Sequence, residues 1–404
     1  MPSLTRRALL SKLLVTAPPV VEDSGKHTLV CVFLRGGADT MNLVVPYADD
    51  TYHRARPTIR IQEPKNGSTD ASRAIRLDDH YGLHPMLKPL QEKFAEGRLS
   101  IVQNVGTDNT TGSHFECQDQ MEHGDSMQGS PAGGGWLGRF LRARADKNYG
   151  PLSAIAYGTK LPESLRGAPA VSVLQSLDDI ALKTPSGDSA AAAAALAQLY
   201  GADVTLLGNQ GRETLSLFER VRSLQSNDYK PSNDATYPKD GFGNGMREIA
   251  RLIKARVGLE IASIDLDGWD THFIQGSDSG LQAARIKLLA EGLAAFDADL
   301  KEHRQNITVM VMTEFGRRIY ENSSLGTDHG RGFSTFVLSD KFKGGRIISK
   351  WPSVIEETFT GPGGLKIEHD YRSVFAEVLR GSMGLEKPEA VFPDFKVAPV
   401  GLLG

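Results

Sequence analysis

The sequence GTDHGRG, residues 326–332, places an aspartate directly before a histidine in a glycine-rich loop. It follows NITVMVMTEFGRR, which has the continuous apolar run of a buried strand. Asp328 and His329 have two interpretations. They are the polar tip of a turn, or they are half of a metal site, because zinc and related ions accept carboxylate and imidazole ligands. The second interpretation requires partners elsewhere in the chain.

Similar groups follow two other predicted strands. The strand HTLVCVFLRGG leads into ADTMN, and the strand LEIASIDLDG leads into WDTH. The acids and the histidine at these two exits are Asp39, Asp267, Asp270 and His272. In sheets with parallel strands, ligands bind at the carboxyl ends of the strands. Carboxylates gathered at one edge repel one another unless a cation neutralises them. We therefore predict a divalent metal site here, with zinc or manganese as the ion and calcium or magnesium as alternatives.

A fourth exit offers a hydroxyl group. LSIVQNVG reads as a strand, and SHFECQDQMEHG reads as a helix with Ser113 at its N-cap. A helix N-terminus favours an anionic group, so Ser113 is either a nucleophile or a bare cap. His114 is expected to make local hydrogen bonds. Arg35, which ends the first strand, is the candidate contact for an anionic substrate.

Strands alternate with helical patterns over most of the chain. Amphipathic helices are predicted in GMREIARLIKARVG, in GLQAARIKLLAEGLAAFDADLKEHR and in DYRSVFAEVLRGSMG. This alternation predicts an α/β fold, with a mostly parallel central sheet and helices on both faces. The region of about 186–240 begins with an alanine-rich helix former and contains a polar Pro/Asn/Asp loop. It is expected to be a helical insertion or cap.

The composition limits the partners. A chain of 404 residues with 40% hydrophobic residues can bury a large core. A net charge of −3 gives no reason to expect a nucleic-acid partner, and no run approaches the roughly 18 apolar residues of a transmembrane helix. The two cysteines exclude a disulfide scaffold, and Cys31 is expected to be a buried hydrophobe. The oligomeric state stays open.

The first residues differ from the rest. MPSLTRRALLSKLLVTAPPVV contains adjacent arginines followed by an apolar stretch, like a twin-arginine export signal. We interpret residues 1–25 as a leader and 26–404 as a single domain. This predicts a periplasmic or secreted protein. The alternative is an amphipathic N-terminal helix on a cytoplasmic protein.

Six ordered motifs resemble one family. They are VFLRGGADTMNLVVPY, SHFECQDQME, GWLGR, LPESLRG, GWDTH and TEFGRR with TDHGRG. In this order the chain resembles the DUF1501 family, whose core is similar to the alkaline-phosphatase and sulfatase superfamily. The resemblance implies an alkaline-phosphatase-like fold, with Asp39 as the first acid, Ser113 as the nucleophile and His369 as a late histidine. It assigns the metal to Asp267 or Asp270 with His272, and to Asp328 with His329.

These observations support two hypotheses. The first is an exported, metal-dependent hydrolase of phosphate or sulfate esters, acting on a small-molecule or polymer ester. The second is a superfamily relative without turnover that serves as an exported binding or assembly protein. A nicotinamide-dependent oxidoreductase is discounted, because RGGADT lacks the G-x-G-x-x-G spacing after the first strand.

Overall fold

We describe the protein from a computed structural model, which covers residues 26–125, 133–144, 149–177, 182, 184, 188–225, 229–349 and 361–403. The predicted leader lies outside these residues. The helices are α2 (Thr40–Leu43), α3 (Asp50–Ala55), α4 (Lys88–Ala95), α5 (His114–His123), α6 (Trp136–Ala143), α7 (Ser189–Gly201), α8 (Leu206–Gln225), α9 (Gly241–Lys254), α10 (Leu281–Asp299) and α11 (Tyr371–Met383).

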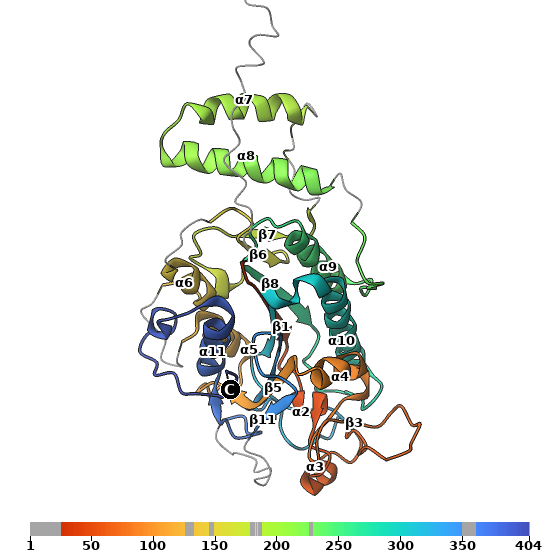
Figure 1. Cartoon of the computed structure of the whole chain (residues 1–404). Helices are drawn as coiled ribbons and strands as arrows, with labels where there is room; N and C mark the ends of the chain where they lie inside the picture. The colour runs from red at the N-terminus through yellow and green to blue at the C-terminus, as the bar shows by residue number, and fades with distance from the viewer. Residues whose placement is uncertain are drawn as a thin grey trace, which may run out of the picture.

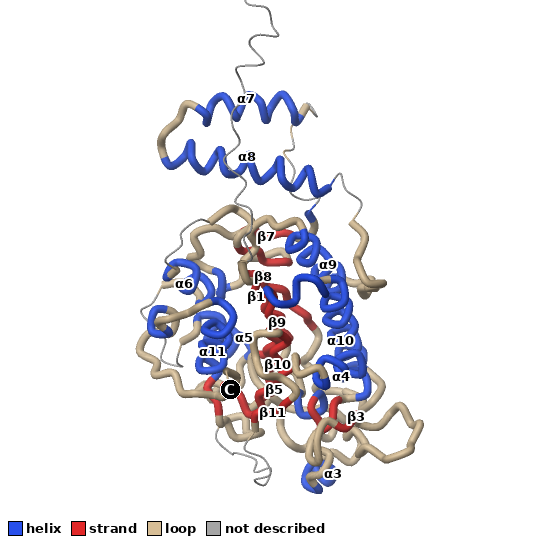
Figure 2. The backbone as a smooth tube through the Cα atoms, in the orientation of Figure 1, coloured by secondary structure: helices blue, strands red, loops and turns tan. Residues whose placement is uncertain are grey.

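A nine-stranded sheet forms the centre of the molecule (Figure 2). Its strands are β1 (Thr28–Arg35), β5 (Leu99–Gly106), β6 (Ala154–Tyr157), β7 (Ser172–Leu174), β8 (Ile261–Asp267), β9 (Ile307–Thr313), β10 (Phe333–Ser339), β11 (Arg346–Ile348) and β12 (His369–Asp370). The order is β11-β5-β10-β9-β1-β8-β6-β7, with β12 also paired to β5. Only β10 runs antiparallel to its neighbours, β5 and β9. The predicted mostly parallel α/β fold is confirmed.

Both faces of the sheet are covered, as β1 shows. Its residues alternate between two separate hydrophobic cores, because successive side chains of a strand point to opposite faces. One core contains Val30, Val32 and Leu34, and the other contains Leu29, Cys31 and Phe33. Helices α4, α9 and α10 cover the first face, and α5, α6 and α11 cover the second (Figure 1). Cys31 is fully buried and is a free cysteine.

Two smaller parts lie around this core. Strands β2 (Val44–Val45), β3 (Ile75–Arg76) and β4 (Gly82–Leu83) form a three-stranded sheet. Helices α7 and α8 pack against each other beyond the edge strand β7 (Figure 1). None of the α7 residues is buried. These helices lie inside the region expected to be an insertion or cap, and the division into domains stays a prediction. No helix among the described residues is long and apolar enough to cross a membrane.

The strand directions bring several loops to one edge. Strands β1, β8 and β9 are mutually parallel, and β5 points the same way because β10 is antiparallel to both β5 and β9. The carboxyl ends of these four strands therefore lie at the same edge of the sheet. Since β10 starts at this edge, the connection from β9 to β10, residues 314–332, remains there.

Candidate metal centre

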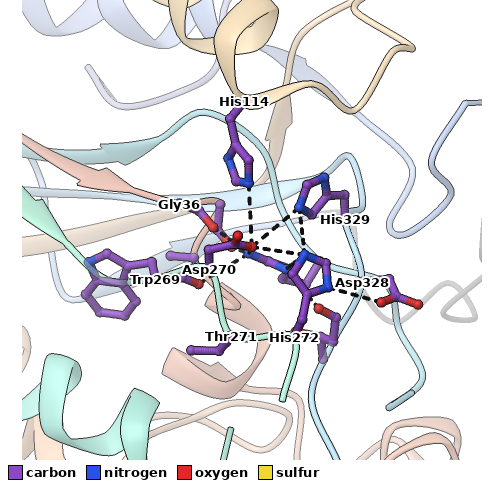
Figure 3. Close-up of polar contacts among 12 residues, drawn as sticks. Gly36, His114, Trp269, Asp270, Thr271, His272, Asp328 and His329 are labelled. Carbon is purple, nitrogen blue, oxygen red and sulfur yellow. Dashed lines mark hydrogen bonds and ion pairs between the residues drawn. The ribbon is translucent and has the colours of Figure 1, made fainter. Parts of the chain in front are cut away.

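Three imidazoles meet at this edge around the Oδ1 atom of Asp270 (Figure 3). The Nε2 atoms of His272, His329 and His114 lie 3.0, 3.4 and 3.5 Å from it. The Nε2 atoms of His272 and His329 are 2.9 Å apart. The side chains come from the loop after β8, from the β9–β10 connection and from the first turn of α5. Segments far apart in the sequence thus supply one cluster of donor atoms.

Each imidazole of the cluster is held from behind through its Nδ1 atom. The partners are Glu314 for His114 (2.9 Å), Asp328 for His272 (3.2 Å) and the carbonyl of Gly112 for His329 (2.7 Å). Carbonyl and carboxylate oxygens only accept hydrogen bonds, so each Nδ1 carries the proton. In its neutral form each ring then presents its Nε2 lone pair to the cluster. This pattern of a fixed far nitrogen is typical of metal-binding histidines.

The loops that carry the cluster can approach closely because of Gly36, which has no side chain, and Arg317, which bonds to several of them. Gly36 has φ +121°, and a Cβ atom there would lie 2.5 Å from the backbone nitrogen of Asp270. The buried guanidinium of Arg317 donates to the Thr327 carbonyl at 2.8 Å and to the Asp270 carboxylate at 2.6 Å. A β-bridge joins Arg317 to His329. Arg317 therefore connects the exits of β1, β8 and β9 and fixes where the cluster residues lie.

The charges in the cluster shift two pKa values. Hydrogen bonds to Asp270 and Glu314 raise the pKa of His114 to about 9, against the opposing effect of burial. Burial alone would raise the pKa of Asp270, but hydrogen bonds from His114, His329 and Arg317 hold that pKa far below its usual range. Asp270 is thus a firm carboxylate. Its negative charge attracts a cation, whether a proton on an imidazole or a metal ion.

The cluster fits a zinc ion. The Nε2 atom of His114 is buried, and its contact with the Oδ1 atom of Asp270 is long, at 3.5 Å. His114, Asp270 and His329 offer donor atoms that all lie within 4.8 Å of one another. Donors of a tetrahedral zinc ion lie about 3.3 Å apart, since each is about 2.0–2.1 Å from the ion. The three Nε2 atoms lie 3.0–3.5 Å from the Oδ1 atom of Asp270, and those of His272 and His329 lie 2.9 Å apart. These separations are close to the value for zinc. Calcium and magnesium prefer oxygen ligands, so three imidazoles favour zinc.

Asp39 lies apart from the cluster. It is 1% exposed and forms a two-pronged ion pair with the fully buried Arg56, at 2.6 and 2.9 Å. Gln275 donates a further hydrogen bond to it at 2.7 Å. The resemblance and the strand-exit argument both made Asp39 a metal ligand. The structure instead gives this carboxylate a cation within the protein, and we leave it out of the proposed ligand set.

Two other expected ligands also lie outside the donor atoms. Asp267 is the last residue of β8 and is exposed. Asp328 contacts the far nitrogen of His272 and accepts a hydrogen bond from Asn322 at 3.0 Å. Burial raises the pKa of Asp328, but these contacts hold it below its usual range. Asp328 therefore orients His272, and of the two acids left open, Asp270 lies in the cluster whereas Asp267 lies outside its donor atoms.

The two residues expected to act on substrate have different surroundings. Arg35 is paired with Glu122 and with Asp265, the latter at 3.1 Å, so its charge is already neutralised. Ser113 is the N-cap of α5, as predicted, and accepts a hydrogen bond from the Glu116 amide at 3.5 Å. This contact is long, and the hydroxyl is only partly buried. Ser113 therefore lies beside the cluster, whereas Arg35 serves an ion-pair network.

Sequence reasoning underestimated three residues. His114 was expected to make local hydrogen bonds, yet its Nε2 faces Asp270. Glu314 is fully buried behind it, and also accepts from the Gly36 amide at 2.8 Å and from Gln118 at 2.9 Å. Arg317 was not singled out from the sequence. The available signal was position, because His114 opens a helix after a strand exit and Glu314 directly follows β9.

A separate cavity lacks the carboxylates that the cluster offers to a metal. It has a volume of about 170 Å³ and lies at the opposite edge of the sheet, where β1 and β9 begin. Its lining includes Lys26, Arg256 and His303 and has no carboxylate. His369, the expected late histidine, lies in β12 beside Val105. The donor atoms for a metal are those at the carboxyl edge.

The fold and the cluster define an α/β protein with a candidate metal centre at the carboxyl edge of its sheet. The chain belongs to the family described as "Protein of unknown function (DUF1501)", whose model matches residues 26–366. This confirms the family resemblance seen in the motifs. The comparison with curated proteins gave no match.

Several solved structures are similar to this chain. The C-terminal periplasmic domain of EcEptC from Escherichia coli, in complex with zinc, has a TM-score of 0.37 and 9% identity, covering 80% of this chain and 77% of that one. A protein in the alkaline phosphatase superfamily from Vibrio parahaemolyticus has a TM-score of 0.34 and 10% identity, covering 80% and 62%. Alkaline phosphatase from the Antarctic bacterium TAB5 has a TM-score of 0.32 and 9% identity, covering 89% and 100%. These TM-scores are low, so the assignment of function depends on the site itself.

Proposed function

We propose that this protein is an exported, zinc-dependent hydrolase of phosphate or sulfate esters. The observation that carries the proposal is the convergence of three Nε2 atoms on one carboxylate oxygen, with every Nδ1 atom held by an acceptor. The proposed ligands are His114, Asp270, His272 and His329. When bound, zinc polarises an ester oxygen and stabilises charge that develops on the leaving oxygen.

The chain's own residues prepare the site. Glu314 and Asp328 fix two of the imidazole rings, so the rings lose little freedom when a ligand binds. Arg317 keeps Asp270 ionised, but its N–H groups are engaged with Asp270, His272 and backbone carbonyls, so it contributes charge rather than a contact to substrate. The first turn of α5 offers unpaired amides beside His114, which suits a tetrahedral anion.

Ser113 is the candidate nucleophile. Its hydroxyl lies at the start of α5, next to His114, and the hydrogen bond that it accepts from the Glu116 amide is long, at 3.5 Å. The variant Ser113→Ala separates the two roles. A nucleophile is indispensable, so turnover would be abolished. A bare cap contributes only about 1 kcal/mol of stability, and turnover by direct attack of water would persist.

The metal site is tested first by zinc binding. Purified protein is stripped with a chelator, reloaded, and measured by mass spectrometry of the metal and by calorimetry. We expect stoichiometric zinc in the wild type and its loss in Asp270→Ala and His272→Ala. The matched control is Asp267→Ala, which removes a neighbouring exposed acid outside the donor set. Absence of zinc from the wild type, or equal loss in the control, contradicts the site.

Turnover is tested next with 4-nitrophenyl phosphate and 4-nitrophenyl sulfate. The zinc-loaded wild type should release 4-nitrophenol from one of them, and the Asp267→Ala protein should do so at a comparable rate. The Asp270→Ala and His272→Ala proteins should be inactive at any zinc concentration that leaves the wild type active. Bound zinc without turnover of a broad ester panel would exclude the hydrolase.

One observation favours a second function, that of an exported binding or assembly protein. The resemblance assigns Asp39 to metal binding, yet Arg56 neutralises it inside the fold. A relative that lost one acid of its metal centre can keep a single ion without turnover. Stoichiometric zinc together with the absence of hydrolysis would identify this alternative.

A further inference from the structure

Exposed apolar side chains flank the candidate metal centre. Phe115, which follows His114, is 87% exposed, and Phe273, which follows His272, is 69% exposed. Ile274 is 71% exposed and Leu325 is 45% exposed. Large apolar residues with this much exposure lose the favourable free energy of burial. Isolated cases are ordinary, but these four occur on the three segments that carry the proposed ligands.

Two of these residues also adopt an unfavourable backbone conformation. Ile274 has φ 42° and Leu325 has φ 60°. Glycine, asparagine and aspartate adopt this region at little cost, whereas a β-branched side chain such as isoleucine is strained there. Among the described non-glycine residues with positive φ, Ile274 and Leu325 are the apolar ones. Strain that is retained at an exposed site points to a function.

The two strained residues are held side by side. The Ile274 amide donates to the Ser324 carbonyl at 2.9 Å, and the Gln275 amide donates to the Leu325 carbonyl at 2.9 Å. The Gln275 side chain is fully buried, and it accepts from the hydroxyls of Thr271 and Thr327 at 2.8 Å each. The loops that carry Asp270, His272 and Asp328 are thereby joined to each other. The apolar residues Ile274 and Leu325 therefore lie on joined loops that also carry cluster residues.

We propose that Phe115, Phe273, Ile274 and Leu325 form an apolar rim that binds the alkyl or aryl group of the substrate ester. The proposal rests on the proposed function, because it gives the substrate class for the same site. The anionic group would lie at the donor cluster, and the apolar group of the ester would cover the rim. The preferred substrate is therefore an amphiphilic or aromatic ester rather than a small polar one.

The observations favour a single substrate group over a membrane surface. The exposed charges of the cluster are the carboxylates of Asp270 and Asp328, whose side chains are 47% and 50% exposed. The four rim residues include no lysine or arginine, whereas surfaces that bind anionic bilayers are rich in both. Four side chains interspersed with polar ligands also form a small surface compared with the patches of protein interfaces.

The first test measures binding without turnover. Linear alkylphosphonates from methyl to octyl are titrated into zinc-loaded protein by calorimetry. We expect the affinity to rise about 2- to 4-fold per methylene group until the rim is covered, because each buried CH2 contributes about this factor. Vesicles of phosphatidylcholine and phosphatidylglycerol, titrated in parallel, should not bind. An affinity independent of chain length, or binding to vesicles instead, overturns the proposal.

The second test uses Ile274→Asn and Leu325→Asn, which remove apolar surface and suit a positive φ. The melting temperature should rise by about 1–3 °C as strain is relieved, while the gain in affinity per methylene falls to near 1-fold in the double variant. The matched control is Val204→Ser, because Val204 is 90% exposed but lies on the α7–α8 turn. It should change neither quantity. A lower melting temperature in the asparagine variants means that the side chains stabilise the fold, and the rim is then wrong.

The two proposals fail in different ways. If zinc binds and alkylphosphonates bind with the expected chain-length dependence, but no ester is hydrolysed, the hydrolase is wrong and the rim stands. If esters are hydrolysed without preference for apolar groups, the hydrolase stands and the rim is wrong. If zinc-loaded protein binds no alkylphosphonate, both are wrong.

Discussion

Two carboxylates at the same edge of the sheet have opposite surroundings. Asp39 is buried and its charge is neutralised by Arg56, with Gln275 completing its hydrogen bonds. The Asp270 side chain is 47% exposed and faces three imidazoles as well as Arg317. Both acids pair with a buried arginine, but Asp39 is enclosed with Arg56 whereas Asp270 also faces imidazoles and solvent, so only Asp270 is a candidate metal ligand. Asp39 supports the loop that holds His272, and Asp270 faces the solvent.

The same contrast applies to the histidines. His84 is fully buried, accepts from the Met86 amide through Nδ1 at 3.0 Å, and contacts the Ser277 carbonyl through Nε2 at 2.9 Å. Both of its nitrogens are satisfied by the backbone. His114 is held by Glu314 at Nδ1, and its buried Nε2 makes a long contact of 3.5 Å with the Asp270 carboxylate. A histidine whose second nitrogen faces a carboxylate is suited to bind a cation there, whereas a histidine with both nitrogens bonded to the backbone is structural.

The largest expected effect on stability comes from removing the arginine that pairs with Asp39. Arg56→Leu leaves the buried Asp39 carboxylate unpaired, and we expect a loss of about 3–5 kcal/mol in the free energy of unfolding, measured by urea denaturation. The exposed partner of the comparison, Asp270→Asn, should cost about 1 kcal/mol without zinc. The double variant Asp39→Asn with Arg56→Leu should recover part of the loss. Equal costs for the two sites would remove the distinction.

Zinc bound at the cluster around Asp270 should stabilise the folded protein. Free zinc at about 100 times the dissociation constant raises the free energy of unfolding by about 2.7 kcal/mol, because the ion binds only the folded state. Calorimetry with and without a chelator measures this change. Asp270→Ala should abolish the gain, and Asp267→Ala should keep it. A gain that persists in Asp270→Ala would place the ion elsewhere.

Glu314 tests the support behind the cluster. In Glu314→Gln the carboxylate that fixes the Nδ1 atom of His114 becomes an amide. We expect zinc affinity to fall about 10- to 100-fold, as for other groups that orient metal ligands. Competition with a fluorescent chelator measures the affinity. Gln118→Ala serves as the control, because it removes another hydrogen-bond partner of Glu314 without touching His114. It should have the smaller effect.

The smallest effect concerns pH. Burial lowers the pKa of His84 to about 4, from an ordinary value of 6.5. The unfolded chain takes up a proton on His84 below pH 6.5 while the folded protein does not until about pH 4. The free energy of unfolding therefore decreases as the pH is lowered through this window, by about 1 kcal/mol from pH 7 to pH 5.5. Urea titrations of the wild type and His84→Gln should differ in slope by this amount.

Much of the fold was accessible from local patterns. The apolar run of β1, the amphipathic period of α9 and α11, and the serine cap of α5 each depend on neighbouring residues. Strand β10 was missed, although its seven residues are all buried. An antiparallel strand inserted between two parallel ones has no local signal, because pairing direction depends on distant strands.

The site was accessible only in part. Motifs and strand exits singled out Asp270, His272 and His329, which the fold brings together, but also Asp39, which it does not. Arg56 lies 17 residues from Asp39 and Glu314 lies 200 residues from His114. Nothing near these residues in the sequence shows that they pair. The spacing of charged residues therefore gives candidates for ligands but not their partners.

The sequence by itself determined the kinds of donor groups and the edge of the sheet at which they emerge, because side-chain chemistry and strand periodicity are local properties. Only the fold sets which carboxylate is enclosed with an arginine, as Asp39 is with Arg56, and which pairs with an arginine but also faces imidazoles, as Asp270 does. That choice depends on distances of a few ångströms between side chains from separate segments, since the energy of a charge is set by its nearest partners and its exposure to water.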